Sequence, residues 1–259
     1  LDGVSEKVYY RHWDVDSPKA AIVFLHGFGE HTGLYDRYAA ALATRGIALW
    51  ALDHPGHGRS DGRRGYVESL SALSANARTL LSVVAEQLPG VPITLQGHSL
   101  GAATALYQTL TDSSGISKLV LSGAPLAIPD WIAESERDAG NTIELDPTGL
   151  SRDLSYLSAL ADDPLCFTDG EEGESLASAL AELWQLLPDH ISELKMPLLL
   201  IHGDDDQVAP FDIALRESER AADRTVVSFA GGKHDIINDI VHAEVAAAVS
   251  DFVLGEMKK

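Results

Sequence analysis

The 259-residue sequence has little cysteine, few basic side chains and no long apolar run. Cys166 is the only cysteine, so no intrachain disulfide can form and the chain does not depend on oxidising conditions. Lys and Arg total 19 against 39 Asp and Glu, which gives a formal net charge of −20. This charge disfavours binding to nucleic acid and to anionic lipid headgroups, and it is typical of a well-solvated acidic surface.

Three sequence signals of other protein classes are also missing. No apolar stretch approaches the roughly 18 residues that span a membrane, so we expect at most transient contact with lipid surfaces. No basic segment followed by an apolar one opens the chain, and cytoplasm is the default expectation, although numbering starts at Leu1 and a leader could have been trimmed. No GxGxxG follows the first predicted strand, which excludes a typical dinucleotide site.

Short apolar runs alternate with helical patterns along most of the chain. An antiparallel edge strand is expected at 8–13, and buried strands at 20–25, 47–52, 91–95, 118–122, 197–201 and 225–229. Helices are expected at about 35–45, 69–88 and 239–254. This alternation predicts an α/β fold with a mostly parallel sheet covered by helices on both sides. Ligands of such sheets bind at the carboxyl ends of the strands.

One long stretch breaks the alternation. Between Ser122 and Met196 we expect no buried strand, whereas Leu176, Leu180, Leu183, Trp184 and Leu187 repeat at helical spacing. We therefore expect a core built from residues 1–124 and 191–259, with 125–190 inserted as a helical cap over the site. The alternative is a helical excursion that packs on the side of the core.

The sequence GHSLG at residues 97–101 stands between a predicted strand and a predicted helix. A serine in a sharp strand-to-helix turn is held in a strained backbone conformation with its hydroxyl clear of the sheet. Glycine at 97 and 101 suits a turn too tight for a Cβ atom. The following helix directs free N–H groups toward developing negative charge. Ser99 is the predicted nucleophile.

A nucleophilic serine needs a histidine base and a carboxylate that orients it, and in this arrangement they follow in the order serine, acid, histidine. Among ten histidines, His234 has this order and lies directly after the last predicted strand. His202 lies within a strand end and is interpreted as structural. Asp204, Asp205 and Asp206 all follow the 197–201 strand, and by position each is a candidate acid.

The oxyanion formed during acyl transfer is stabilised by backbone N–H groups. The residue after the nucleophile, Leu100, supplies one of them, and the loop after the first buried strand supplies the other. In that loop Phe28 is the predicted donor, and Gly27 and Gly29 allow the loop to fold back toward Ser99.

Taken together, four segments resemble the monoacylglycerol lipase and lysophospholipase branch of the α/β-hydrolases. They are HGFGEH at 26–31, DHPGHGRSD at 53–61, GHSLG at 97–101, and GDDDQVAP at 203–210 with His234. Ser-Arg-Asp at 151–153, leading to Asp-Pro-Leu at 163–165, resembles the cap of bacterial members. The resemblance covers nearly the whole chain. It implies the α/β-hydrolase fold and a triad of Ser99, Asp206 and His234, with the N–H groups of Phe28 and Leu100 as oxyanion hole.

The resemblance also concerns the substrate. It implies that Glu30 and His98 lie near the glycerol end of a lipid ester. Relatives often carry an arginine between the glycine and tyrosine of the first loop, where this chain has Leu34. A polar contact to the glycerol head is therefore expected to be missing.

Metal-based alternatives find little support in the sequence. His54-x-x-His57 and the aspartate run at 204–206 do not form a coherent set of three or four ligands. A dehalogenase or epoxide hydrolase would need an aspartate in place of Ser99. We expect no metal and no cofactor.

The leading hypothesis is a serine carboxylester hydrolase that cleaves a neutral single-chain lipid ester, such as a monoacylglycerol, through an acyl-enzyme. The first alternative is a lysophospholipase, since Arg59, Arg63 and Arg64 form one locally basic loop. Acyl transfer to an alcohol and a non-catalytic ligand-binding member of the fold are further alternatives. The expected partner is a small-molecule lipid ester, and the sequence does not indicate an oligomeric state.

Overall fold

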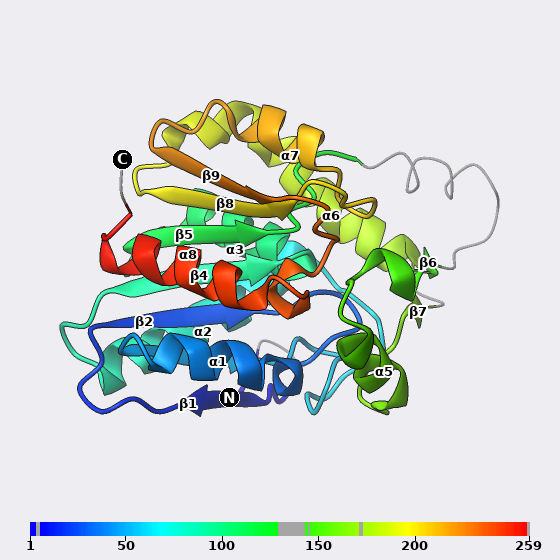
Figure 1. Cartoon of the computed structure of the whole chain (residues 1–259), viewed down its shortest axis with the longest axis horizontal. Coiled ribbons are helices and arrows are strands. Elements are labelled where there is room, and N and C mark those ends of the chain that lie inside the picture. The colour runs from blue at the N-terminus through cyan, green and yellow to red at the C-terminus, as the bar shows by residue number, and fades with distance from the viewer. Residues whose placement is uncertain (4–5, 129–142, 145, 171–172, 258–259) are drawn as a thin grey trace.

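A computed structural model describes residues 1–3, 6–128, 143–144, 146–170 and 173–257. A seven-stranded sheet with the order β1-β3-β2-β4-β5-β8-β9 forms its centre (Figure 1). The strands are β1 (Tyr10–Trp13), β2 (Ala20–Leu25), β3 (Ile47–Leu52), β4 (Ile93–His98), β5 (Lys118–Ser122), β8 (Leu198–Gly203) and β9 (Arg224–Phe229). Every neighbouring pair is parallel except β1 and β3, which run antiparallel. The predicted α/β fold is confirmed, including its antiparallel edge strand.

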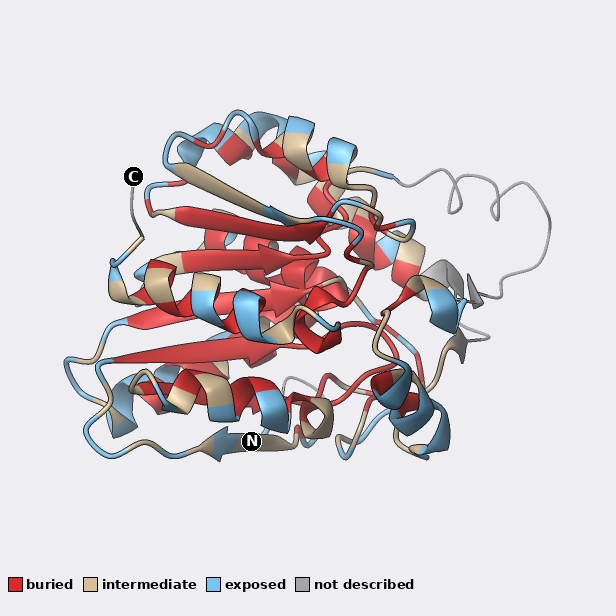
Figure 2. Ribbon diagram, in the orientation of Figure 1, coloured by how far each residue is buried: buried red, intermediate tan, exposed pale blue. Residues whose placement is uncertain are grey.

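The central strands are buried on both faces, as their continuous apolar runs predict (Figure 2). In β2, Ala21, Val23 and Leu25 enter one hydrophobic cluster, and Ala20, Ile22 and Phe24 enter the other. The first cluster includes side chains of α2 (Leu70–Gln87), α3 (Leu100–Thr111), α6 (Gly173–His190) and α7 (Phe211–Ser218). The second includes side chains of α1 (Asp36–Ala43) and α8 (His242–Leu254).

Helix ends follow local side-chain chemistry. Ser69 caps α2 by accepting the N–H of Ala72, which places the helix start where it was predicted. The predicted C-terminal helix at 239–254 is wrong at its start, because α8 begins at His242. Residues Ile236–Asn238 form a 3₁₀ turn, η4, and the extended backbone of Asp239 separates that turn from the helix. Helix α1 likewise begins after a 3₁₀ turn, η1 (Thr32–Tyr35).

The stretch between β5 and β8 contributes no described strand to the central sheet. Its described elements are β6 (Ile143–Glu144), η2 (Pro147–Gly149), α5 (Leu154–Asp162), β7 (Asp169–Gly170), α6 and η3 (Ile191–Glu193). Strands β6 and β7 pair with each other. They lie with α5 beyond the carboxyl edge of the sheet (Figure 1), whereas Leu180 and Leu183 of α6 are buried in the core cluster of α2 and α3. The boundaries of a cap at 125–190 stay a prediction.

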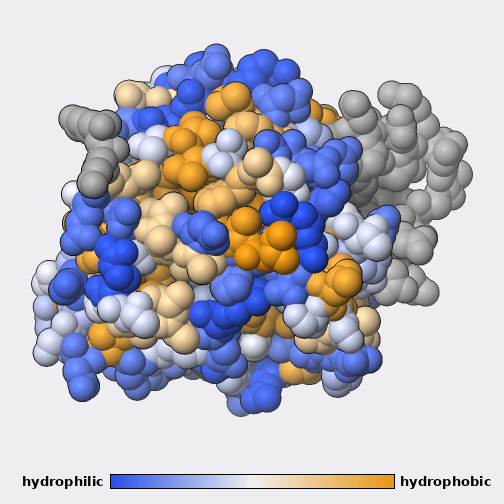
Figure 3. Space-filling view, in the orientation of Figure 1, coloured by the Kyte–Doolittle hydropathy of each residue, from blue (hydrophilic) through white to orange (hydrophobic). Residues whose placement is uncertain are grey.

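The face that carries α8 has a mixed surface. Figure 3 shows hydrophobic residues gathered over α8 within hydrophilic surroundings.

Within the described part of the chain, no helix combines the length and the apolar character that crossing a membrane requires.

Candidate active site

The turn between β4 and α3 holds Ser99 in a strained conformation. Its φ of 52° and ψ of −117° lie in a region that non-glycine residues rarely adopt. A Cβ atom at Gly97 would lie 2.0 Å from the carbonyl oxygen of Gly101, and one at Gly101 would lie 2.0 Å from that of Leu25. The N–H of Ser99 donates to the carbonyl of Ser122, 2.9 Å away, on the neighbouring strand. The backbone geometry is thus that of the predicted nucleophile turn.

Asp206 follows β8 and is buried with four N–H donors around its carboxylate. Oδ1 accepts the backbone N–H groups of Val208 and Ala209, both at 2.9 Å. Oδ2 lies 2.9 Å from Nδ1 of His234 and 3.0 Å from Nε2 of His202. Burial alone would raise the pKa of Asp206, but the two imidazoles hold this pKa well below its usual range. The group is therefore a carboxylate at neutral pH.

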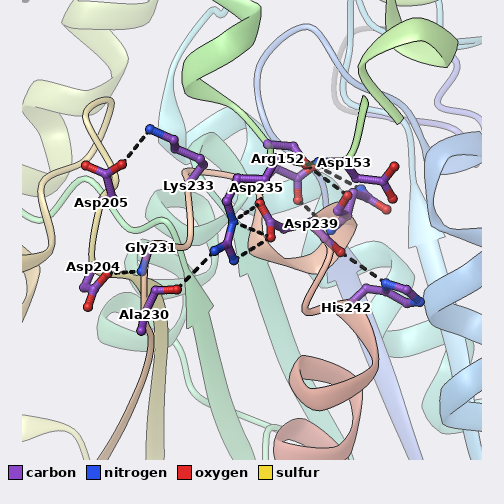
Figure 4. A network of polar contacts seen from close by, with 12 residues as sticks. Arg152, Asp153, Asp204, Asp205, Ala230, Gly231, Lys233, Asp235, Asp239 and His242 are labelled. Carbon is purple, nitrogen blue, oxygen red and sulfur yellow. Dashed lines mark hydrogen bonds and ion pairs between the residues drawn. The ribbon is translucent and has the colours of Figure 1, made fainter. Parts of the chain in front are cut away.

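The other two aspartates of the run have different contacts. Asp204 accepts the N–H of Gly231 at 2.6 Å, and Asp205 forms an ion pair with Lys233 at 2.6 Å (Figure 4). Both attach the loop after β8 to the loop that carries His234. Of the three candidate acids, Asp206 is the one whose carboxylate meets the imidazole of His234.

His234 lies in the loop after β9 and is buried. Because its Nδ1 faces the acceptor Asp206, its Nε2 is the nitrogen that can take up a proton. His234 and Ser99 line one cavity together with Phe28, Glu30 and His98. Burial disfavours the imidazolium, but the adjacent carboxylate of Asp206 outweighs burial and raises the pKa of His234.

This raised pKa predicts the acid limb of the activity. Only the neutral imidazole acts as base, so we expect kcat/KM to fall as the pH drops through a pKa above the ordinary histidine value of 6.5. The measurement is kcat/KM of a soluble ester between about pH 5 and pH 9. Asp206→Asn should move the limb to lower pH, because it removes the charge that stabilises the imidazolium. A limb at or below 6.5 in the parent chain would contradict the expectation.

A second titrating group in the cavity requires a control for that experiment. Burial, reinforced by the charge of Asp235, raises the pKa of Glu30 to about 8. The Glu30→Gln variant removes this group. The acid limb of His234 should persist in the variant, whereas a fall in kcat/KM as the pH rises through about 8 that disappears in the variant belongs to Glu30.

The loop at residues 26–31, called the oxyanion loop below, is held by its own side chains and by the segment after α5. Glu30 Oε2 accepts the N–H of Gly27 at 2.8 Å and the hydroxyl of Tyr35 at 2.5 Å. Gly29 has a φ of +78°, and a Cβ atom there would lie 1.9 Å from the carbonyl oxygen of Phe167. The N–H of Phe167 donates to the carbonyl of Gly29 at 3.0 Å. These contacts hold Phe28 at the cavity that Ser99 lines.

Leu100 is the first residue of α3, and the first N–H groups of a helix have no acceptor within the helix. The Leu100 N–H is therefore suited to the predicted oxyanion contact beside Ser99. The assignment of Phe28 and Leu100 as the donor pair stays a prediction.

Glu30 and His98, expected near the glycerol end of a substrate, both line the cavity with Ser99. His98 Nε2 lies 3.7 Å from Glu30 Oε1. Burial lowers the pKa of His98 to about 4, so its imidazole is neutral at pH 7. Two donors already occupy Oε2 of Glu30, so a proton on this acid would sit on Oε1, the oxygen nearer His98.

The contact between His202 and Asp206 was missed by the sequence interpretation, which treated His202 as structural. Its Nε2 lies 2.7 Å from the carbonyl oxygen of Ala209 and 3.0 Å from Asp206. Since both partners are acceptors, Nε2 carries the hydrogen. The available signal was a buried polar residue at the end of an apolar strand, four positions before an acid.

Two groups of described side chains lie close enough to share a metal ion. They are His31 with Asp163 and Cys166, and Glu30 with His98 and Asp235. In the first group His31 already meets Asp163 and accepts the N–H of Gly33. In the second, the raised pKa of Glu30 leaves this acid mostly protonated at pH 7, which suits a metal ligand poorly. That the site works without a metal or cofactor stays a prediction.

Residues 16–240 match the family described as serine aminopeptidase, S33. The chain belongs to this family. It is 29% identical to a monoacylglycerol lipase of Mycolicibacterium smegmatis, over 97% of this chain and 94% of that protein. It is 30% identical to a monoglyceride lipase of Mus musculus, over 94% of this chain and 86% of that protein.

A solved structure of a monoacylglycerol lipase is also similar to this chain. The crystal structure of a monoacylglycerol lipase of Paleococcus ferrophilus superposes with a TM-score of 0.80 and 26% identity, covering 97% of this chain and 100% of the other. The α/β-hydrolase resemblance is confirmed. These relatives support a serine ester hydrolase, and they do not favour the lysophospholipase alternative.

Proposed function

We propose that this chain is a serine carboxylester hydrolase whose substrate is a neutral single-chain lipid ester, such as a monoacylglycerol. The observation that carries the proposal is the contact between Asp206 and His234 beside a cavity that Ser99 also lines. Ser99 and His234, which are distant in the sequence, thus line one cavity, and Asp206 contacts His234 from behind it. The names of the relatives point to the same substrate class.

In the proposed mechanism Ser99 Oγ attacks the ester carbonyl carbon while Nε2 of His234 takes the hydroxyl proton. Asp206 holds the imidazole in the tautomer that leaves Nε2 free and stabilises the imidazolium that forms. The N–H groups of Phe28 and Leu100 bind the oxyanion of the tetrahedral intermediate. The imidazolium then protonates the leaving alcohol, and water hydrolyses the acyl-enzyme by the same steps.

The leaving alcohol is proposed to contact Glu30 and His98. A protonated Glu30 would donate a hydrogen bond from Oε1, and the neutral His98 ring offers a further polar contact. Both groups are then mostly uncharged at pH 7, which suits a neutral glycerol better than a charged headgroup. Leu34, where relatives often have an arginine, is packed between two hydrophobic clusters and adds no polar contact there.

We expect medium or long acyl chains to be preferred, because Leu150, Leu160 and Phe167 line the cavity with Ser99. Four additional buried methylenes favour a longer chain by about 3 kcal/mol at most, at about 0.8 kcal/mol each. The measurement is kcat/KM for p-nitrophenyl esters of increasing chain length. A strict preference for acetate or butyrate would contradict the expectation.

A matched pair of variants tests the acyl assignment. Leu160→Ala should weaken the preference for long chains, since this buried side chain lines the cavity. Leu154→Ala, on the same helix, should leave the preference unchanged because Leu154 is 78% exposed. Equal effects of both substitutions would remove the support for this part of the proposal.

The lipid class is tested by comparing monoolein with lysophosphatidylcholine at equal concentration. Monoolein should be the better substrate. In the basic loop that could meet a phosphate, Arg64 is already engaged by the segment after α5, since it donates to the carbonyl of Leu165 and lies over the ring of Phe167. Faster hydrolysis of lysophosphatidylcholine would replace the proposed substrate with a lysophospholipid.

Cytoplasm is the proposed location, and cell fractionation tests it.

A further inference from the structure

Residues 149–167, called the α5 bridge below, contact two loops that carry the proposed chemistry. At its start the bridge meets residues 230–239, called the histidine loop. At its end it meets the oxyanion loop. These three segments are distant in the sequence and lie together at the carboxyl edge of the sheet (Figure 1). Figure 4 shows the start of the bridge against the histidine loop.

The start of the bridge is attached to the backbone of the histidine loop. The N–H of His234 donates to the carbonyl of Gly149 at 3.4 Å, and the N–H of Asp235 donates to that of Leu150 at 2.8 Å. Ser151 Oγ also donates to the carbonyl of Asn238 at 3.2 Å. The backbone of the proposed base is therefore bonded directly to the bridge.

Arg152 connects both ends of the histidine loop. Its Nη2 and Nε lie 2.7 Å and 3.0 Å from Oδ1 of Asp239, at the end of the loop. Its backbone N–H donates to Oδ2 of the same residue at 2.8 Å. Its Nη1 donates to the carbonyl of Ala230, at the start of the loop, at 3.1 Å. Figure 4 shows the guanidinium between these two partners.

The end of the bridge is attached to the oxyanion loop. Phe167 donates its N–H to the carbonyl of Gly29, and its ring packs edge-on against Phe28 at 5.1 Å between centroids. His31 Nε2 lies 2.9 Å from a carboxylate oxygen of Asp163. One short segment thus connects the loop of the base to the loop of the predicted oxyanion donor.

Stability alone does not require this ion pair. Asp239 is fully buried and the Arg152 side chain is 27% exposed, and even a fully buried ion pair can often be replaced by apolar side chains of similar volume without loss of stability. An arginine, in contrast, has several donors in a rigid fork and can hold two acceptors at a fixed separation. The fork of Arg152 does so for the two ends of the histidine loop.

We propose that Arg152 is a positioning residue that, through its contacts with Asp239 and Ala230, fixes the histidine loop and so holds His234 in register with Ser99. The α5 bridge then acts as a fixed brace for the base and for the oxyanion loop. This inference rests on the proposed function. Loss of the contacts that Arg152 makes with Asp239 and Ala230 should slow the chemical step and leave substrate binding nearly unchanged.

The test compares Arg152→Lys and the double variant Arg152→Met/Asp239→Leu with the parent chain. The double variant removes the ion pair without leaving a buried charge unpaired. Asp239→Asn is a second, smaller change that keeps the size of the side chain. The control is Arg78→Met, because Arg78 on α2 forms an arginine–aspartate pair at 2.7 Å with Asp112, the residue that follows α3.

Five quantities are measured: the rate of fluorophosphonate labelling, kcat and KM for a soluble ester, the melting temperature, and the proton NMR signal of the His234 Nδ1–H. In the double variant we expect labelling and kcat to fall about 10- to 100-fold, as for other small misplacements of catalytic groups. KM should change by less than about twofold, since uniform binding is untouched. The Nδ1–H signal should broaden, Arg152→Lys should restore part of the rate, and the control should match the parent.

Labelling and kcat at the parent rate, in a double variant that circular dichroism shows to be folded, would overturn the inference. Asp239→Asn should fall between the parent and the double variant, because its amide oxygen can still accept from Arg152. A lower melting temperature with an unchanged labelling rate would do the same, because it is the result of a purely structural contact. Absence of labelling in the parent chain would instead overturn the proposed function. The two failures are therefore distinguishable.

Discussion

Ser99→Ala is expected to lower kcat by about 10⁶-fold, as removal of the nucleophile does in other serine triads. The variant should keep its fold, because the turn is held by backbone contacts such as the hydrogen bond from the N–H of Ser99 to the carbonyl of Ser122. The measurement is ester hydrolysis by purified protein, together with covalent labelling by a fluorophosphonate probe. Labelling should disappear.

The matched control is Ser113→Ala, in the exposed loop between α3 and β5. It should hydrolyse and label like the parent. Labelling that persists in the Ser99 variant would place the nucleophile elsewhere. A parent chain that neither hydrolyses esters nor labels would favour the non-catalytic ligand-binding alternative.

Asp206→Asn is expected to lower kcat by about 10⁴-fold, because an amide no longer selects the imidazole tautomer that leaves Nε2 free. Its oxygen can still accept the N–H groups of Val208 and Ala209, so the loop after β8 should keep its shape. The measurement is kcat at a pH well above the acid limb, where the imidazole is neutral in both proteins. At that pH the changed pKa of His234 no longer affects the rate, so the remaining loss reports the lost orientation of the imidazole.

Asp205→Asn is the control for that substitution, since it lies one residue away and loses only an exposed ion pair with Lys233. Exposed pairs contribute little, about 0–1 kcal/mol, so its kcat should stay near that of the parent. Equal losses in the two variants would contradict the assignment of Asp206 as the orienting acid.

Much of the fold could be predicted because its strands are unusually simple to identify. Ala20–Leu25 and Ile47–Leu52 are apolar at every position, and such runs are typical of strands buried on both faces. The predicted bounds of both strands are those observed. Ser99 was predictable for a related reason: the glycines on either side are required by close backbone contacts, which the GxSxG pattern encodes locally.

The remaining features depend on side-chain directions that sequence spacing does not determine. Asp204, Asp205 and Asp206 follow one strand together, and position alone could not say which carboxylate meets His234. The leucines of α6 indicated a buried face, but not that this face packs into the cluster of α2 and α3. Arg152 and Asp239 are 87 residues apart, so no local pattern could pair them.

The backbone of Ser99 has a consequence for how this protein can change over generations. Its φ of 52° is a conformation that glycine adopts without cost, so Ser99→Gly should raise the free energy of unfolding by about 1 kcal/mol, measurable by urea denaturation. On the proposed function, only selection for turnover keeps a hydroxyl there. In a lineage that no longer needs the reaction, we expect substitution by glycine to give a protein that is more stable and catalytically inactive.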